Sequence, residues 1–503
     1  MLNRKPLALC LAALFVFCVS GCSKSDNDSS GDSGDSAIVE CISLDNFSDK
    51  AFGEYAISWW DLDGDKCISQ SEASKITEIP KQAFKNNNII ASIDDLNLFP
   101  SITMLREEAF AGCIKIKTAN LKYIQIVEQD TFSYTTLTSI SLPKATNVGE
   151  HAFKGVRSLT NVDLPNVETV GDFAFSDTSL ESVSLPKATY VGKRAFGYVY
   201  SLTSVDLPNV ETVDMYAFGF TSLESVSLPK ATNVGKGAFE NMSSLTSVDL
   251  PNVETVGERA FEGTSLESVS LPKATNVGKG AFYNVSSLTD VDLPNVETVG
   301  DFAFEGTSLE SVSLPKATNV GLGAFEDMST LKTLNLPNVE TVGDCAFGFT
   351  SLESVSLPKA TNVGAGAFAD VSTLKTLDLP NVETVGNGAF SRTALESVSL
   401  PKATNVDDSA FYSVSTLKTL DLPMATNIGE EIVVVYNDYS DKYEMLLDTL
   451  YLTSPLPISM SSSSSYDIEG YHNTNLYLNI NKKSEVNGGS WNGIDWKSIT
   501  FVE

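Results

Sequence analysis

The stretch SLESVSLPKATNVGKGAFENMSSLTSVDLPNVETVGERAFEGT, residues 222–264, decides the fold because it is one unit of a repeat. It joins a turn of 22 residues to a turn of 21. Leu-Pro recurs from Pro143 to Pro423 in steps that alternate between these two lengths, so the repeating unit is a pair of turns. A second series, the Phe of Ala-Phe, runs from Phe84 to Phe411 and marks sixteen turns.

Each turn carries Leu-x-x-Val-x-Leu, which alternates as a half-buried strand does, then Pro, a second extended piece ending in Val-Gly, and Ala-Phe. One turn cannot bury its Leu, Val and Phe side chains, whereas stacked turns bury them continuously. We therefore expect a β-rich solenoid of about sixteen turns over residues 79–430, with a small helical N-terminal cap at 37–78 and a divergent C-terminal cap at 431–503. The glycine after Val, as in Gly149, Gly171 and Gly235, indicates either a positive φ or close packing.

The repeat also carries a family resemblance. The pattern L-x-x-V-x-L-P-x-x-x-x-V-G-x-x-A-F resembles the BspA-like leucine-rich repeats, also called the Treponema type, over about residues 79–430. The turns of 21 or 22 residues are slightly shorter than the usual repeat of that family. The resemblance implies a cell-surface binding or adhesion role, with host matrix proteins or other cells among the targets of relatives.

Composition excludes several classes of function. The chain has 503 residues with 34 Lys and Arg against 64 Asp and Glu, a net charge of -30, so nucleic acid is not an expected partner. A hydrophobic share of 42% with 19% charged residues indicates a folded chain. Only two histidines occur, His151 and His472, which excludes a histidine-rich metal site. No nucleophile motif, phosphate loop or isolated carboxylate pair emerges, so an enzyme is the least supported interpretation.

Residues 1–21 have the features of a lipoprotein signal peptide. Arg4 and Lys5 precede an apolar stretch, Leu7–Ser20, that is too short to cross a bilayer as a helix. The run ends in Val19-Ser20-Gly21-Cys22, which resembles the lipobox of bacterial lipoproteins, so we expect Cys22 to carry the lipid. The alternative is an ordinary cleavage site followed by an incidental thiol.

Residues 22–36 form an acidic tether of Ser, Gly and Asp. This segment resembles the export tag of surface lipoproteins in Bacteroides-type Gram-negative bacteria. The resemblance implies a protein anchored to the bacterial outer membrane and facing the cell exterior, the alternative being a plain solvated linker.

Residues 61–72, DLDGDKCISQSE, match a twelve-residue EF-hand calcium loop. The expected ligands are the carboxylates of Asp61, Asp63 and Asp65, the carbonyl of Cys67 and a bidentate Glu72. Lys66 stands where glycine normally makes the sharp turn, so we expect weak, structural Ca²⁺ binding; the alternative is a relic loop that only caps the array. Among the remaining thiols, at most one disulfide is conceivable, between Cys41 and Cys67.

One stretch of the array departs from the repeat. We call the Phe of Ala-Phe in each turn the ladder Phe. Two residues before the ladder Phe, later turns mostly have Gly, whereas four consecutive early turns carry larger side chains. Three further aromatic residues lie nearby. The residues of this aromatic patch are His151, Phe173, Arg194, Tyr216, Tyr198, Tyr200 and Phe220. Aromatic and Arg clusters are typical of binding hot spots, and the alternative is surface packing or drift among duplicated units.

These observations favour a non-enzymatic adhesion lipoprotein. The array is expected to bind a protein or glycoconjugate on host or neighbouring cells as a monomer, with the lipidated Cys22 in the membrane. The alternative is a passive structural scaffold of the cell envelope whose array only spaces or coats.

Overall fold

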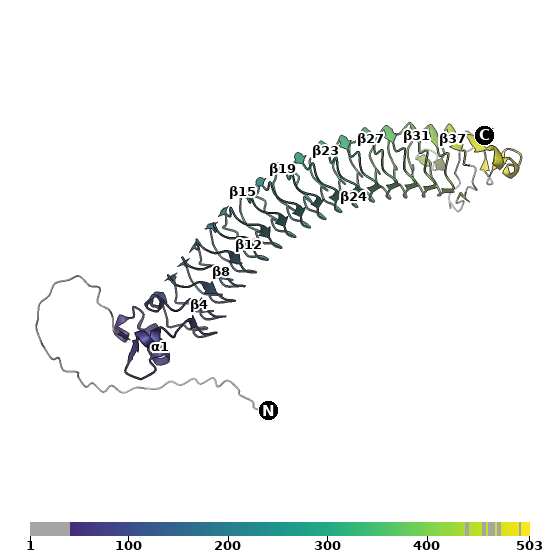
Figure 1. Ribbon diagram of the computed structural model, residues 1–503. Coiled ribbons are helices and arrows are strands. Elements are labelled where there is room, and N and C mark those ends of the chain that lie inside the picture. The colour runs from purple at the N-terminus through teal and green to yellow at the C-terminus, as the bar shows by residue number, and fades with distance from the viewer. Residues whose placement is uncertain are drawn as a thin grey trace, which may run out of the picture. The chain divides into compact units, whose positions relative to one another are not determined.

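The computed structural model describes residues 41–437, 442–454, 459–460, 468–469, 474–491 and 494–502. The expected signal peptide, Cys22 and the tether lie outside the described residues. The described fold is a solenoid whose turns stack one after another along the chain (Figure 1). Within the described ranges, no helix combines the length and apolar character needed to cross a membrane.

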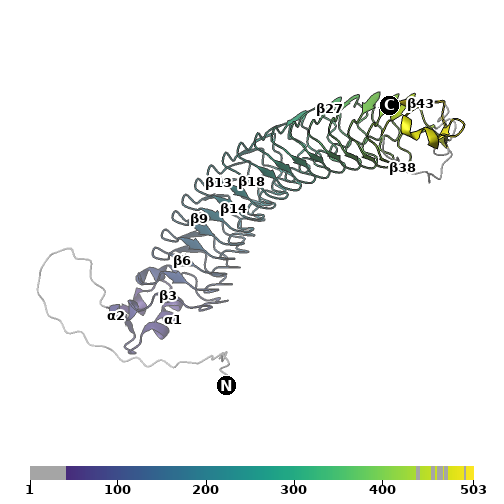
Figure 2. The same cartoon turned by 45° about the vertical axis from the view of Figure 1, so that its right-hand side comes forward.

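Between residues 118 and 428, each turn of the solenoid contributes one strand to each of two rows (Figure 2). The first row holds three-residue strands, formed where Leu-x-x-Val-x-Leu alternates inward and outward. These strands are β5 (Thr118–Asn120), β7 (Ser139–Ser141), β9 (Asn161–Asp163), β11 (Ser182–Ser184), β13 (Ser204–Asp206), β15 (Ser225–Ser227), β17 (Ser247–Asp249), β19 (Ser268–Ser270), β21 (Asp290–Asp292), β23 (Ser311–Ser313), β25 (Thr333–Asn335), β27 (Ser354–Ser356), β29 (Thr376–Asp378), β31 (Ser397–Ser399) and β33 (Thr419–Asp421).

The second row holds two-residue strands ending at the Val of Val-Gly, each paired in parallel with the next. These strands are β3 (Glu78–Ile79), β4 (Met104–Leu105), β6 (Ile126–Val127), β8 (Asn147–Val148), β10 (Thr169–Val170), β12 (Tyr190–Val191), β14 (Thr212–Val213), β16 (Asn233–Val234), β18 (Thr255–Val256), β20 (Asn276–Val277), β22 (Thr298–Val299), β24 (Asn319–Val320), β26 (Thr341–Val342), β28 (Asn362–Val363), β30 (Thr384–Val385), β32 (Asn405–Val406), β34 (Asn427–Ile428) and β38 (Ser459–Met460).

The second row counts eighteen strands, so the array is two turns longer than the sixteen that the Phe series predicts. The difference lies at the C-terminal end, in β34 and β38. Val433 takes the place of the ladder Phe after β34, and the carbonyl of Ile432 before it accepts the N–H of Phe411, as the Ala before each ladder Phe does. A count based on Phe therefore stops too early.

The first row confirms that a pair of turns is the unit. From β11 to β29 its strands pair only in twos, each Ser-type strand with the Asp-type strand that follows, as in β11 with β13. The Oγ of Ser184 donates to Oδ2 of Asp206 at 2.8 Å, and the same bond recurs along the array. The Asp column is therefore a ladder of paired side chains, with Asn335 replacing Asp in one turn.

A stack of phenylalanines forms the centre of the core. Sixteen rings, from Phe84 to Phe411, lie 5.1–5.7 Å apart between neighbouring centroids and tilt by no more than 13°. These rings are buried together with the Leu and Ala positions of the repeat and the Val of Val-Gly, whereas the strand Val of the Asp-type turns, such as Val205 and Val248, is only partly buried. Each turn therefore buries its apolar residues against the turns on either side, as the repeat predicts.

The N-terminal cap covers the first ring of this stack. It consists of β1 (Cys41–Ser43), the 3-10 helix η1 (Leu44–Asn46), α1 (Lys50–Trp60), β2 (Cys67–Ser69) and α2 (Gln70–Ala73), and η2 (Asp94–Leu98) follows the first turn. The rings of Phe52, Tyr55 and Trp59 in α1 lie 5.1–5.7 Å from Phe84. Cys41 and Cys67 are joined by a disulfide with their Cα atoms 5.7 Å apart.

The C-terminal end changes pattern after β33. The first row continues as a sheet of five strands in the order β31, β33, β37, β40 and β43. The remaining elements are β35 (Val435–Asn437), β36 (Lys442–Glu444), β37 (Thr449–Leu452), β39 (Ile468–Glu469), β40 (Asn475–Asn479), η4 (Ile480–Glu485), β41 (Ser490–Trp491), β42 (Ile494–Asp495) and β43 (Ser498–Val502).

Candidate functional site

The aromatic patch lies on a segment with an unusual backbone. In all sixteen turns with a ladder Phe, the residue two before the Phe and the residue two after it have positive φ between 50° and 70°. Around Phe153, the N–H groups of His151, Phe153 and Gly155 all donate to carbonyls of the following turn at 2.7–2.9 Å. This left-handed segment therefore hydrogen-bonds each turn to the next, and it explains why glycine is frequent at these positions.

Of the two roles expected for the glycine after Val, a positive φ and close packing, the structure supports close packing. The φ of Gly149, Gly171 and Gly235 is not positive. A Cβ on Gly149 would lie 2.7 Å from the carbonyl carbon of Glu128 in the preceding turn. This glycine is therefore required by close packing between backbones, and the left-handed positions lie further along the turn.

Four consecutive turns place large side chains at the left-handed position before the Phe. The rings of His151 and Phe173 lie 5.1 Å apart. The guanidinium carbon of Arg194 lies 5.8 Å from the Phe173 ring centroid and 5.0 Å from that of Tyr216. Arg194 is therefore held between two aromatic rings, within the range of cation–π attraction.

The left-handed position after the Phe is occupied by Tyr198 and Phe220, and Tyr200 lies two residues beyond Tyr198. Tyr198 and Phe220 stack with centroids 4.9 Å apart, and Tyr200 lies 6.4 Å from Tyr198. The guanidinium of Arg194 is 6.0 Å from the Tyr198 ring, so the two columns meet there. Tyr200 is 65% exposed, which makes it the part of the patch most open to a partner.

From Tyr216 to Cys345, each large residue at the left-handed position before the Phe is followed by glycine at that position in the next turn. A Cβ added to Gly237 would lie 2.3 Å from the ring of Tyr216, and one added to Gly323 would lie 2.6 Å from the ring of Phe302. Each large side chain thus lies over the next turn, and glycine leaves space for it. Between His151 and Tyr216 no glycine intervenes, so those side chains pack on one another.

The sequence analysis missed residues that belong to this surface. Lys154 and Lys193 reach over the Phe173 ring, with Nζ 5.3 and 6.0 Å from its centroid. Arg259 and Phe302 occupy the left-handed position before the Phe farther along the array, between turns that have glycine there. The sequence did contain a signal for the two lysines, because each directly precedes a left-handed position, Gly155 or Arg194. A cation at such a place can reach a ring in a neighbouring turn.

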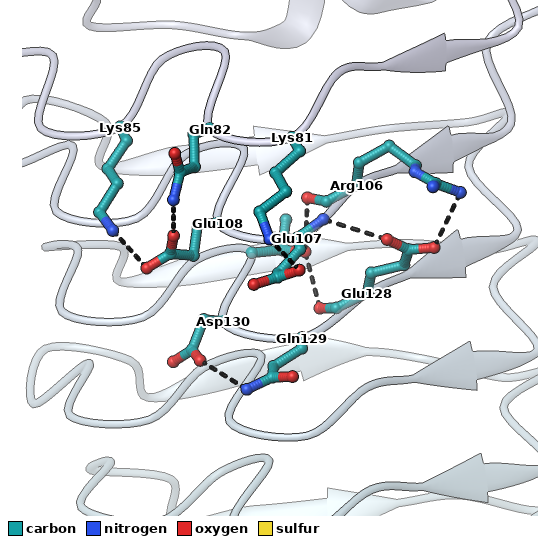
Figure 3. A network of polar contacts seen from close by, with 10 residues as sticks. Lys81, Gln82, Lys85, Arg106, Glu107, Glu108, Glu128, Gln129 and Asp130 are labelled. Atoms are coloured by element: carbon teal, nitrogen blue, oxygen red, sulfur yellow. Dashed lines mark hydrogen bonds and ion pairs between the residues drawn. The ribbon is translucent and has the colours of Figure 1, made fainter. Parts of the chain in front are cut away.

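The turns before the patch differ from it in charge pairing. Figure 3 shows their polar network, in which Lys81 contacts Glu107 at 2.6 Å, Lys85 contacts Glu108, and Arg106 contacts Glu128 at 3.2 Å. By contrast, no carboxylate of the described chain lies within 4.0 Å of the cationic groups of Lys154, Lys193 or Arg194. Three cations therefore surround one ring without ion-pair partners.

A buried carboxylate borders the patch. Glu240 is 8% exposed, and its Oε2 has no hydrogen-bond partner within the described residues. Burial, with a contribution from the neighbouring Glu262, raises the pKa of Glu240 above its usual value. Gly237 separates it from the patch, since a Cβ there would touch both the Tyr216 ring and Glu240 Oε2.

The acidic loop of the N-terminal cap brings three of its predicted ligands together. One carboxylate oxygen each of Asp61, Asp63 and Asp65 lies within 4.8 Å of the others. Lys66 adopts a φ of 68°, the left-handed conformation that the turn requires. Asp61 accepts the N–H groups of Gly64 and Lys66 at 2.7 and 2.8 Å, which fixes the loop around the carboxylates.

Glu72 is oriented differently from a calcium ligand. Its Oε1 accepts the N–H of Leu62 at 2.7 Å, and its Oε2 accepts the N–H and Oγ of Ser69, each at 2.8 Å. The bond from the Ser69 N–H is the largest of the effects that lower the pKa of Glu72. The oxygen-only donor set suits a hard cation, but Glu72 would have to exchange these bonds to bind one.

A shallow hollow lies over β5, β7 and β9. It has a volume of about 350 Å³ and is lined by short polar side chains that include Asp94, Asn120, Ser141 and Asp163. Asp94 accepts the N–H of Asn120 at 2.7 Å, and Asp163 accepts the hydroxyl of Ser141 at the same distance. Its lining contains no histidine, cysteine or lysine, and its Ser141–Asp163 pair is the same bond that recurs along the array.

Comparison with known proteins adds the family. No curated protein matches the chain. A leucine-rich repeat protein structure from Bacteroides ovatus is 20% identical, covering 73% of this chain and 87% of its own, with a TM-score of 0.45. A leucine rich cell surface protein from Faecalibacterium prausnitzii is 22% identical, covering 70% and 84%, with a TM-score of 0.34.

The family assignment depends on the repeat sequence itself, because the two solved structures are too distant to support an assignment. The family described as BspA type leucine rich repeat region matches residues 65–135, 125–234, 211–332 and 297–418. Together these ranges span more than half of the chain, and they include every turn of the aromatic patch. The chain therefore belongs to the BspA type leucine-rich repeat family.

Proposed function

We propose that this protein is a non-enzymatic cell-surface lipoprotein that uses the aromatic patch to bind a protein or glycoconjugate on host or neighbouring cells. Leucine-rich repeat proteins commonly serve in recognition or surface adhesion, and their solenoids are typical of non-enzymatic binders. The observation that carries the proposal is the run of four large side chains, from His151 to Tyr216, at left-handed positions where later turns mostly have glycine.

Backbone strain strengthens this argument. A non-glycine residue in the left-handed region costs about 1–2 kcal/mol, so four in succession cost several times that amount. The array shows that glycine serves at the same position, as in Gly237 and Gly280. The same strain occurs in other turns, as at Glu108 and Phe302, so it supports a role for the patch only together with the packing of the patch rings on one another.

The test replaces Phe173, Arg194 and Tyr216 together with glycine. The variant should lose binding to its partner in a screen of matrix proteins, mucins and glycans, and its unfolding temperature should not fall, because the strain is relieved. The matched control is Arg259→Gly with Phe302→Gly, which changes the same column outside the patch and should bind normally. Undiminished binding by the triple variant would contradict the proposal.

A passive scaffold is the second candidate, and the regularity of the outer ladders favours it. Lys230, Lys273 and Lys316 each donate to an Asn side chain of the preceding turn at 2.6 Å, and the Ser–Asp bonds repeat likewise. Such uniform pairing stiffens an array without recognising anything. If wild-type protein binds no member of the screen while its deletion alters envelope integrity, the scaffold is the better description.

We also propose that Cys22 carries the lipid and that the protein faces the exterior of the bacterial outer membrane. The support is the sequence Val19-Ser20-Gly21-Cys22 followed by the acidic tether. Cys22→Ala should release the protein from the membrane fraction. Protease added to intact cells should remove the wild-type array, whereas protection until the cells are broken would place it inside.

The acidic loop is proposed to bind Ca²⁺ weakly in a structural role. The convergence of Asp61, Asp63 and Asp65 supports this, together with the turn at Lys66. Millimolar Ca²⁺ should raise the unfolding temperature of the wild-type protein, and the triple Asp→Asn variant should show no response. An unfolding curve insensitive to both Ca²⁺ and chelator would contradict calcium binding.

A further inference from the structure

We propose that the cationic centre of the patch, Lys154, Lys193 and Arg194 around the Phe173 ring, binds an acidic sugar that carries a single carboxylate or sulfate group at the end of a glycan. This inference rests on the proposed function and names the class of partner. It begins from the three cations that lie 5.3–6.0 Å from one ring centroid.

The geometry leaves the donors of this centre unused. All three side chains are half-buried, and among the described residues none of their cationic groups contacts a carboxylate. Phe173 and Tyr216 hold the Arg194 guanidinium on two sides, so little side-chain freedom remains to be lost on binding. A planar guanidinium with free N–H groups matches a carboxylate or sulfate through paired hydrogen bonds.

The aromatic residues beside the centre point to a sugar as the carrier of that group. Tyr198 and Phe220 present a stacked pair, and Tyr200 is largely exposed next to them. Rings of this kind offer flat apolar faces against which the C–H face of a sugar can lie. An acidic peptide supplies the anion, but it places a flat apolar face beside that anion only where an aromatic or proline residue adjoins the acidic one.

The net charge limits the ligand to a short one. The chain carries -30 charges overall, and its carboxylates are distributed along the array. At physiological ionic strength a charge is screened beyond about 8 Å, so an oxyanion at Phe173 is influenced mainly by the groups beside it. These are the three cations and the carboxylate of Asp172, whose Oδ1 accepts the N–H of Lys193 at 2.9 Å. A long polyanion would extend past this centre onto acidic turns and be repelled.

The experiment measures the binding of matched acidic and neutral glycans to the full-length chain. Sialyllactose and lactose differ by one carboxylated sugar, and galactose 6-sulfate and galactose differ by one sulfate. Displayed densely on a polymer to gain avidity, at least one acidic member should bind ten times or more tightly than its neutral counterpart. Added NaCl should weaken that preference.

Variants locate the effect. Lys154→Ala, Lys193→Ala and Arg194→Gly together should reduce the preference below twofold. The control, Lys279→Ala with Phe302→Gly, removes a contact of the same kind, with Nζ 5.5 Å from the ring, and should keep it. Circular dichroism would verify that both variants retain the wild-type fold.

Three outcomes would overturn the inference. Equal binding of acidic and neutral glycans would exclude recognition of the oxyanion, and an unchanged preference in the triple cation variant would place it elsewhere. A polyglutamate peptide that competes as well as the acidic glycan would indicate a peptide partner. The wider proposal stands separately, because replacement of Phe173, Arg194 and Tyr216 can still abolish binding to matrix proteins when no glycan binds.

Discussion

Two kinds of glycine in the array have different physical roles, and alanine substitution separates them. Gly388 has a φ of 61°, and a Cβ there would find its nearest neighbour 3.8 Å away, so Gly388→Ala should cost about 1 kcal/mol of strain alone. Gly278 has no positive φ, but its Cβ would lie 2.7 Å from a backbone carbon of Gly257. Gly278→Ala should therefore cost about 2–3 kcal/mol from overpacking.

Urea denaturation of the two alanine variants measures this difference. Equal costs, or a larger cost at Gly388, would show that close packing between turns does not constrain the glycine after Val. The two positions have the same residue type and similar sequence context, so each variant serves as the control for the other.

Glu240 should make stability depend on pH in an identifiable direction. Burial raises its pKa in the folded state, so the folded protein binds the proton more tightly than the unfolded chain does. Stability from this group is fully present below the unfolded pKa of about 4.3 and is lost as pH rises through the raised folded value. Acidification from pH 7 toward pH 5 should therefore stabilise the wild-type protein relative to Glu240→Gln.

Thermal unfolding of wild type and variant across pH 4–8 measures this dependence, with exposed Glu353→Gln as the control. Glu240→Gln should be at least as stable as wild type at pH 7 and should have a flatter pH profile. A profile identical to wild type would show that Glu240 is solvated in the folded state.

At the scale of elements, Asp49 attaches the cap helix to the first turn. Its carboxylate accepts the N–H of Phe52 in α1 and the N–H groups of Ala91 and Ser92 beyond the first ladder Phe. Burial alone would raise the pKa of Asp49, but these bonds outweigh it and lower the pKa. The stabilisation is therefore present above the unfolded pKa and is lost as pH falls through the lower folded value.

Asp49→Ala should destabilise the cap by about 2–3 kcal/mol, because a helix cap and two further acceptors are lost together. Hydrogen exchange should accelerate in Lys50–Trp60 and leave the central turns unchanged. Asp49→Ser restores the cap of α1 but cannot reach Ala91 and Ser92 equally well, so it should recover part of the loss. Uniform acceleration along the whole array would contradict a local role.

The sequence predicted the elements that depend on a repeated side chain and missed those that depend on the backbone. The Leu and Phe positions are buried as expected, because period and polarity determine them, whereas the strand Val of every second turn, as at Val205 and Val248, is only partly buried. The left-handed positions were missed because residues as different as Arg259, Phe302 and Cys345 occupy them, and only the glycines carry a conformational signal. The contact of Lys154 with Phe173 was missed because it joins different turns, which no local pattern reports.

At the scale of the whole molecule, stability should be the sum of contacts between neighbouring turns. Phe282 touches only the rings of Phe261 and Phe304 within the stack, at 5.3 and 5.2 Å. An array of this kind has no contact that joins its distant parts directly. Removal of one ring should therefore break the stack where it is removed, at a cost of about 3–5 kcal/mol.

The position of the lost ring should decide the result, since Phe282 and Phe411 are both fully buried and chemically equal. Phe282→Ala interrupts the array in its middle, so limited proteolysis should cut near residue 282 and leave two protected fragments. Phe411→Ala weakens a turn near the C-terminal end, so the same protease should trim that end and leave the earlier turns intact. If both variants instead unfold in one transition and are degraded completely, the turns are coupled over the whole array. A defect in the most distant turn would then destabilise the aromatic patch as well.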